Sequence, residues 1–125
     1  MFSFTTSGSF NNTEAWLKRI QQDQAFRAIL ERGGFKGVLA LRLATPVDSG
    51  RTAASWDFEI KTVRGGYILT FTNSDIENGF PVAVMIQYGH GTGSGGYIQG
   101  IDYINPALKP VFDEISDELW KVVTS

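Results

Sequence analysis

The chain of 125 residues contains no cysteine and a single histidine, so it lacks the side chains on which several common kinds of site depend. Without cysteine there is no disulfide scaffold, thiolate zinc site, iron–sulfur cluster or cysteine nucleophile. One histidine excludes metal sites built from several histidines. Charged residues make up only 19%, and the net charge is −2. A dedicated nucleic-acid binder normally has a basic excess, which is missing here.

Long apolar runs are missing as well. No stretch approaches the ~20 consecutive apolar residues of a membrane-spanning helix, and the N-terminal sequence does not resemble a secretory signal. Apolar residues nevertheless make up 42% of the chain, enough for a genuine core at this length. Residues 1–10 are rich in Ser, Thr and Gly. We therefore expect a flexible arm over 1–10, then a single domain over 11–125 with no membrane segment.

Helical patterns occur on both sides of the middle of the chain. Apolar residues recur at helical spacing from Asn11 up to the pair Gly33-Gly34, which predicts a helix that ends at the glycines. A second helix is expected over 35–44. It should end there because Pro46 disfavours the helical conformation at Thr45. A last helix is expected to begin at Asn105-Pro106, with Asn as cap and Pro at the first helical position.

The middle of the chain alternates apolar and polar residues, as strands do. Trp56, Phe58 and Ile60 alternate with charged residues and predict a half-buried strand. A turn over 64–67 then leads into a return strand over 67–72. Together the elements predict an α+β fold, in which a small antiparallel sheet has N-terminal helices and a C-terminal helix packed on one face.

Residues 80–88 fit either a strand or a short helix. The β-branched residues Val82, Val84 and Ile86 favour a strand. Pro81 and Gly89, however, stand where a helix begins and ends. We favour the helix.

A glycine-rich stretch over 89–100 follows. Gly91–Gly96 matches the dinucleotide-binding pattern G-x-G-x-x-G, but neither a helix start nor a lysine comes after it, so we interpret it as a surface loop. His90 has no nucleophile and orienting acid that the sequence places beside it, which favours a solvated loop residue over a catalytic one. We expect the loop to be mobile in the free chain and ordered by a neighbouring subunit, with Tyr97 and Ile98 as anchors.

The residues around Gly50 combine an acid, a hydroxyl and a guanidinium, from Asp48, Ser49 and Arg51. Such a set resembles a site. It also forms a turn in which Asp48 or Ser49 accepts hydrogen bonds from backbone N–H groups, and we favour this structural interpretation. The acidic residues of the last helix are interpreted as a solvated face. We expect no catalytic residue, no metal site and no cofactor.

Two segments are distinctive in their order and spacing. They are the turn Pro46-Val47-Asp48-Ser49-Gly50-Arg51 and the stretch Tyr88-Gly89-His90-Gly91-Thr92-Gly93, followed by Asn105-Pro106. Together they resemble the phage head–tail joining proteins, also called tail completion or minor tail component proteins, of long non-contractile-tailed phages. The match covers about residues 12–122. Thr52 stands where members often have leucine, and Gln87 where many have glutamate.

The resemblance implies a structural virion protein and not an enzyme. Its place would be the head–tail junction, and the host cytoplasm during assembly. It implies a ring of identical subunits, with six as our estimate, between the head connector or stopper and the tail terminator or tail tube. Genomic DNA would pass through without sequence-specific binding. The turn over 46–51 would be structural, and the stretch over 88–93 with Tyr97 and Ile98 would form an assembly interface.

Two alternatives stay open. The first is the tail terminator, a ring that caps the tail tube. The second belongs to a different class, a small nucleic-acid-binding regulatory module. Residues 1–52 hold seven basic and four acidic residues, net +3, and residues 53–125 hold four and nine, net −5. This polarity is explained either by solvated helix faces or by head-to-tail association of copies.

Overall fold

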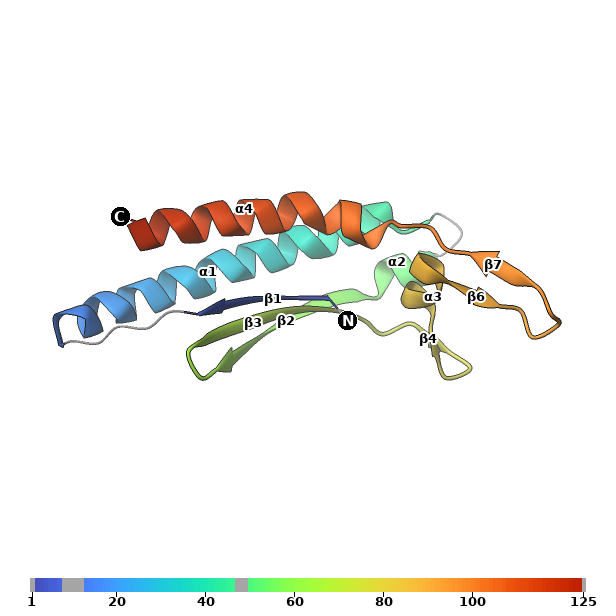
Figure 1. Cartoon of the computed structure of the whole chain (residues 1–125), viewed down its shortest axis with the longest axis horizontal. Helices are drawn as coiled ribbons and strands as arrows, with labels where there is room; N and C mark the ends of the chain where they lie inside the picture. The colour runs from blue at the N-terminus through green and yellow to red at the C-terminus, as the bar shows by residue number, and fades with distance from the viewer. Residues whose placement is uncertain (1, 8–12, 47–49, 125) are drawn as a thin grey trace.

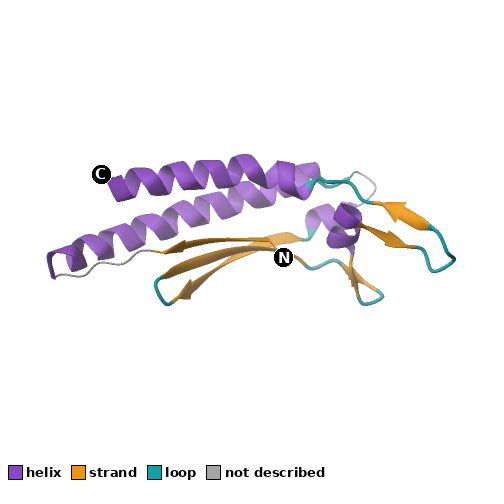
Figure 2. Ribbon diagram, viewed as in Figure 1, coloured by secondary structure: helices purple, strands orange, loops and turns teal. Residues whose placement is uncertain are grey.

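The computed structural model describes residues 2–7, 13–46 and 50–124. The elements are, in order, β1 (Phe2–Ser7), α1 (Thr13–Ala44), α2 (Gly50–Ala54), β2 (Trp56–Val63), β3 (Gly66–Asn73), β4 (Ile76–Glu77), β5 (Phe80–Pro81), α3 (Val82–Tyr88), β6 (Gly89–Gly91), β7 (Tyr97–Gln99) and α4 (Ile104–Thr124). Helices and short antiparallel sheets combine in an α+β fold, as predicted (Figures 1 and 2).

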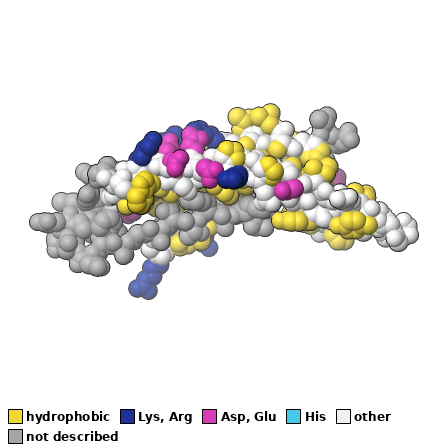
Figure 3. Space-filling view, turned by 45° about the horizontal axis from the view of Figure 1, so that its top comes forward, with side chains coloured by type: hydrophobic (Ala, Val, Ile, Leu, Met, Phe, Trp, Pro, Cys, Tyr) yellow, Lys and Arg dark blue, Asp and Glu magenta, His cyan; other side chains and the backbone are white. Residues whose placement is uncertain are grey.

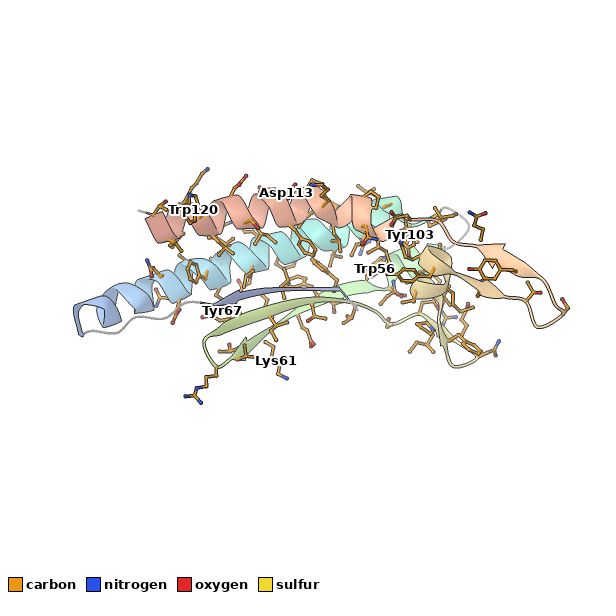
Figure 4. All side chains as sticks on the ribbon, viewed as in Figure 1. Trp56, Lys61, Tyr67, Tyr103, Asp113 and Trp120 are labelled. Atoms are coloured by element: carbon orange, nitrogen blue, oxygen red, sulfur yellow. The ribbon has the colours of Figure 1, made fainter. Side chains whose placement is uncertain are left out.

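In Figure 1, α1 lies between α4 and the main sheet. The sheet is antiparallel in the order β1-β3-β2. β2 and β3 form the predicted hairpin, with Gly65 at φ +86° in its turn. Trp56, Leu69 and Phe71 are buried on the sheet, whereas Lys61 points away from the helices (Figure 4). One face of the sheet therefore forms the core and the other is exposed.

The first strand replaces the flexible arm that the sequence predicted over residues 1–10. Phe2 to Ser7 pair antiparallel with β3, from Phe2 opposite Phe71 to Ser7 opposite Gly66. Phe and Thr favour strands, and the edge of β3 offers unpaired N–H and C=O groups that a further strand satisfies. The prediction is therefore wrong for residues 2–7. Residues 8–10 lie outside the described part of the chain.

Helix α1 continues without a break through Gly33 and Gly34, where the sequence predicted the end of one helix and the start of another. The reason is close packing on two sides. A Cβ atom at Gly33 would lie 2.6 Å from Cγ1 of Ile115 on α4, and one at Gly34 would lie 2.7 Å from Cγ of the Phe58 ring on β2. Glycine inside a helix costs about 1 kcal/mol relative to alanine, and here the close approach of α4 and β2 offsets that cost.

The core lies where α1 meets the sheet and α4. On α4, the buried residues recur every three or four positions, as the sequence predicted: Ile104, Leu108, Val111, Ile115 and Leu119. The Phe112 ring lies 6.2 Å from the Phe71 ring of β3, so α4 also reaches the sheet. At the surface, Lys36 pairs with Glu114, and Nη2 of Arg32 lies 3.5 Å from Oε2 of Glu118. These ion pairs are exposed and add little to stability.

Beyond the sheet, α3 and two short hairpins extend the molecule at one end (Figure 1). β4 and β5 are joined by Asn78 and Gly79, both with positive φ, at +53° and +80°. The short helix favoured for 80–88 is present as α3 over 82–88 and ends at Gly89 with φ +81°, whereas Phe80 and Pro81 form β5 and Pro81 precedes the helix. β6 and β7 follow as a hairpin that projects from the body.

Gly34→Ala should lower the free energy of unfolding by about 1–3 kcal/mol, because the added methyl group overlaps the Phe58 ring. Gly50 is the matched control, since it is also helical but nothing lies within 4 Å of a Cβ placed there. Gly50→Ala should be neutral or slightly stabilising. Urea unfolding followed by circular dichroism compares the two. Equal stability of wild type and Gly34→Ala would show that the close approach of α1 and β2 is not required.

Candidate functional site

The predicted turn over 46–51 is described only in part, because Val47, Asp48 and Ser49 lie outside the described residues. The capping role of Asp48 therefore stays a prediction. Just before the turn, Thr45 Oγ1 accepts a hydrogen bond of 2.9 Å from Nε1 of Trp56. This bond joins the end of α1 to the start of β2. The predicted turn lies in the chain segment between these two elements.

After the gap, Arg51 on α2 faces a buried carboxylate that the sequence analysis did not single out. Nε of Arg51 lies 3.5 Å from Oδ1 of Asp75, and Thr52 Oγ1 donates a hydrogen bond of 2.6 Å to Oδ2. The backbone carbonyl of Asp75 accepts from the N–H of Val82, at 3.1 Å. Arg51 and Asp75 thus connect α2 to the start of α3, a structural role consistent with the interpretation of this turn.

The base of the β6–β7 hairpin is held by the side chain of Gln87, which is only 6% exposed. Its Oε1 accepts hydrogen bonds from the backbone N–H groups of Tyr103 and Ile104, at 3.0 and 2.9 Å. Its Nε2 donates to Oδ1 of Asp102, at 2.6 Å. The first N–H groups of a helix have no partner within that helix. Gln87 therefore provides the acceptor at the start of α4.

This acceptor explains why α4 begins at Ile104 and not at the predicted cap, Asn105. The Asn105 side chain is used differently: its Nδ2 donates to Oδ1 of Asp102, at 3.0 Å. The prediction of Asn105 as the cap and Pro106 as the first helical residue was therefore wrong by two residues, because α4 begins at Ile104 and a side chain distant in sequence replaces the local cap.

Three further contacts fix the hairpin base. The Ile101 N–H donates to the carbonyl of Ile86, at 2.8 Å. The Tyr103 hydroxyl donates to the carbonyl of Ala83, also at 2.8 Å, and burial raises the pKa of Tyr103 to about 12. A Cβ at Gly100 would lie 2.6 Å from the carbonyl carbon of Tyr88. Residues 83–88 and residues 100–103 are therefore in direct contact at the base of the hairpin.

The glycine-rich stretch forms a hairpin of β6 and β7, where the sequence analysis expected a surface loop; its mobility in the free chain stays a prediction. Gly89 and Gly91 lie opposite Gln99 and Tyr97 in the register of β6 and β7. A Cβ at Gly89 would lie 2.8 Å from the N atom of Gly100, so glycine there permits the close pairing. At the tip, the backbone N–H of Thr92 donates to the carbonyl of residue 96 at 3.1 Å. Ordering of this segment by a neighbouring subunit remains a prediction.

His90 lies opposite Ile98 in the hairpin and is half-buried, where the sequence predicted a solvated side chain. Its Nδ1 is buried with no hydrogen-bond partner among the described residues. Gly93, at the hairpin tip, has a φ of +79°. Within the described ranges, no group of three or more histidine or acidic residues could hold a metal ion.

Large apolar side chains that are more than half exposed occur at several places on the described chain: on the β6–β7 hairpin and its base, on α1, on the β4–β5 hairpin (Ile76 and Phe80) and near the end of α4 (Trp120 and Val123). We call the exposed apolar side chains of the β6–β7 hairpin and its base, Tyr88, Tyr97, Ile98 and Ile101, the hairpin surface. Tyr97 and Ile98 are successive residues of β7 and therefore lie on opposite faces of the ribbon. The α1 stripe consists of Phe35, Leu39 and Leu43. Figure 3 shows hydrophobic side chains over the end of the molecule that carries the hairpins. Exposed apolar patches of this kind on a folded chain mark interaction sites.

The α1 stripe follows one side of the helix, because its members are four residues apart. The Phe35 ring packs edge-on against Phe58 of β2, with ring centroids 5.0 Å apart. Beside Phe35, a groove of about 370 Å³ runs between α1 and β2. The sequence pattern showed these residues as the apolar side of a helix, but it did not show that they are exposed.

No family model, curated protein or solved structure matches the chain. Among the described residues, no helix has the length and apolar character needed to cross a lipid bilayer. The features of the chain that bear on its function are the hairpin surface, the α1 stripe and the contacts that fix the hairpin base.

Gln87→Ala should lower the free energy of unfolding by about 2–3 kcal/mol, because it leaves two buried backbone N–H groups without an acceptor. The matched control is Gln99→Ala on β7, where the side chain is exposed; its effect should stay within about 0.5 kcal/mol. Urea unfolding of both variants measures the difference. A Gln87→Ala protein as stable as Gln99→Ala would mean that Gln87 does not hold the base.

Proposed function

We propose that this chain is a structural component of a phage head–tail junction, where copies of it form a ring through which genomic DNA passes. The observation that carries the proposal is a projecting apolar hairpin on a fixed base, together with a second exposed apolar surface on α1. A subunit with two such surfaces is suited to contacts with other chains. The segment Tyr88–Thr92, which supports the family resemblance beside the more specific turn over 46–51, runs from the end of α3 into this hairpin.

The proposal assigns no enzymatic activity and no cofactor to the chain. Two of the buried polar side chains connect elements of the fold: Gln87 bonds the start of α4, and Asp75 faces Arg51 and Thr52. His90 is paired in register with Ile98 and not with an acidic residue. These arrangements support a role in holding elements in place rather than in chemistry on a substrate.

The proposed partners are other copies of the chain, the head connector or stopper, and the tail terminator or tail tube. A ring of six is our estimate. The ring would be part of the virion, and its subunits would be in the host cytoplasm before assembly. The same surfaces suit the ring that caps the tail tube, so the tail terminator stays the alternative within this class.

The test uses the virus that encodes the chain, with a tag after residue 125, since the C-terminus lies at the end of the molecule far from the β6–β7 hairpin (Figure 1). Sedimentation should place the tagged chain in the fraction of complete particles. Deletion of the gene should leave separate heads and tails, and a plasmid copy should restore joining. Joined, infectious particles without the gene would contradict the proposal.

A gel-shift experiment at low salt separates the proposal from a nucleic-acid-binding module. A chain of net charge −2 is expected not to retard duplex DNA. Retardation that disappears with added salt would favour the regulatory module instead.

A further inference from the structure

We propose that the hairpin surface of one copy docks on the α1 stripe of the next copy, in a head-to-tail contact. This inference rests on the proposed function for its setting in a ring, but its evidence is the shape and charge of the two surfaces. Both are apolar, and they are unlike in form: one is a projecting two-stranded ribbon, the other a row along a helix beside a groove. Unlike surfaces on one chain generate heterologous contacts, which form a ring where the rotation between copies closes and an open filament where it does not.

The hairpin surface is nearly free of charge. Between residues 78 and 108, Asp102 is the only Asp, Glu, Lys or Arg in the sequence. This segment can therefore lie against an apolar surface without burying an unpaired charge, which would be costly. The one carboxylate, at the base of the hairpin, is exposed at the edge of the surface.

The groove beside the α1 stripe is lined by side chains of both charges, Arg27, Glu31 and Glu59. Farther along the helix, Arg32 and Lys36 face carboxylates of α4. Arg42 lies next to Leu43, is exposed, and has no ion-pair partner among the described residues. The carboxylate at the base of the nearly neutral hairpin therefore has the charge opposite to that of the guanidinium at the edge of the stripe.

The fixed base makes the hairpin a preformed arm. Gln87, Tyr103 and Ile101 bond it to the body within a single chain. Docking then orders only the tip and the side chains at the contact, which lowers the entropy cost of association.

The absence of cysteine makes cross-linking a clean test. Leu39→Cys and Ile98→Cys proteins are mixed in equal amounts, treated with diamide, and analysed by non-reducing electrophoresis and peptide mass mapping. The disulfide between Cys at 39 of one protein and Cys at 98 of the other should exceed its share of a statistical mixture. The protein that carries both substitutions should form a ladder that ends in a discrete closed product.

Trp120→Cys is the matched control. Trp120 is 68% exposed, similar to the two test positions, but lies near the far end of α4 (Figure 4). Mixed with Ile98→Cys, it should give only the statistical products. Arg42→Glu in the Leu39→Cys protein should reduce the cross-link severalfold, and Arg42→Lys should preserve it.

A statistical mixture for positions 39 and 98 would overturn the inference, as would disulfides formed mainly between two Leu39→Cys copies. Either result, with the tagged chain in complete particles, would overturn only this contact. If the 39–98 cross-link is specific but particles still join in the absence of the gene, the contact is supported and the proposed function is overturned.

Discussion

The end of the molecule that carries the β6–β7 hairpin depends on the buried side chain of Gln87. It stands on α3, bonds two N–H groups at the start of α4 and donates to Asp102 between the hairpin and that helix. A glutamine fits these partners because its amide both accepts and donates. A glutamate at this position would accept from the same N–H groups but would place a second carboxylate beside Asp102. The amide therefore matches the local set of partners in this chain.

The regular spacing of apolar residues predicted the helices and strands that bury only one face. The alternation through Trp56, Phe58 and Ile60 appears as β2, and the spacing from Leu108 to Leu119 appears as the buried side of α4. Local signals failed where a distant segment decides. Gly33 and Gly34 predicted the end of a helix, yet both lie inside the continuous helix α1, where α4 and β2 pack closely against them. Asn105 read as a cap, yet Gln87 bonds the start of α4 instead.

The candidate site was predictable in its composition but not in its geometry. The sequence predicted a glycine-rich surface loop over 89–100, and it identified Tyr97 and Ile98 as anchors. Periodicity did not separate Leu41, which is fully buried on α1, from Leu39 and Leu43 on the same helix, which are exposed. That distinction depends on where α4 and the sheet lie around α1. Asp75 likewise has no periodic signal, and only the fold places it beside Arg51.

The central claim is that the hairpin base is fixed within the free chain. Amide hydrogen exchange resolved by residue tests it directly. The account predicts slow exchange for the N–H groups of Tyr103, Ile104 and Ile101, comparable to that of Leu69 in the core, and fast exchange at the tip over 93–95. Exchange of Tyr103 and Ile104 as fast as that of the tip would contradict it.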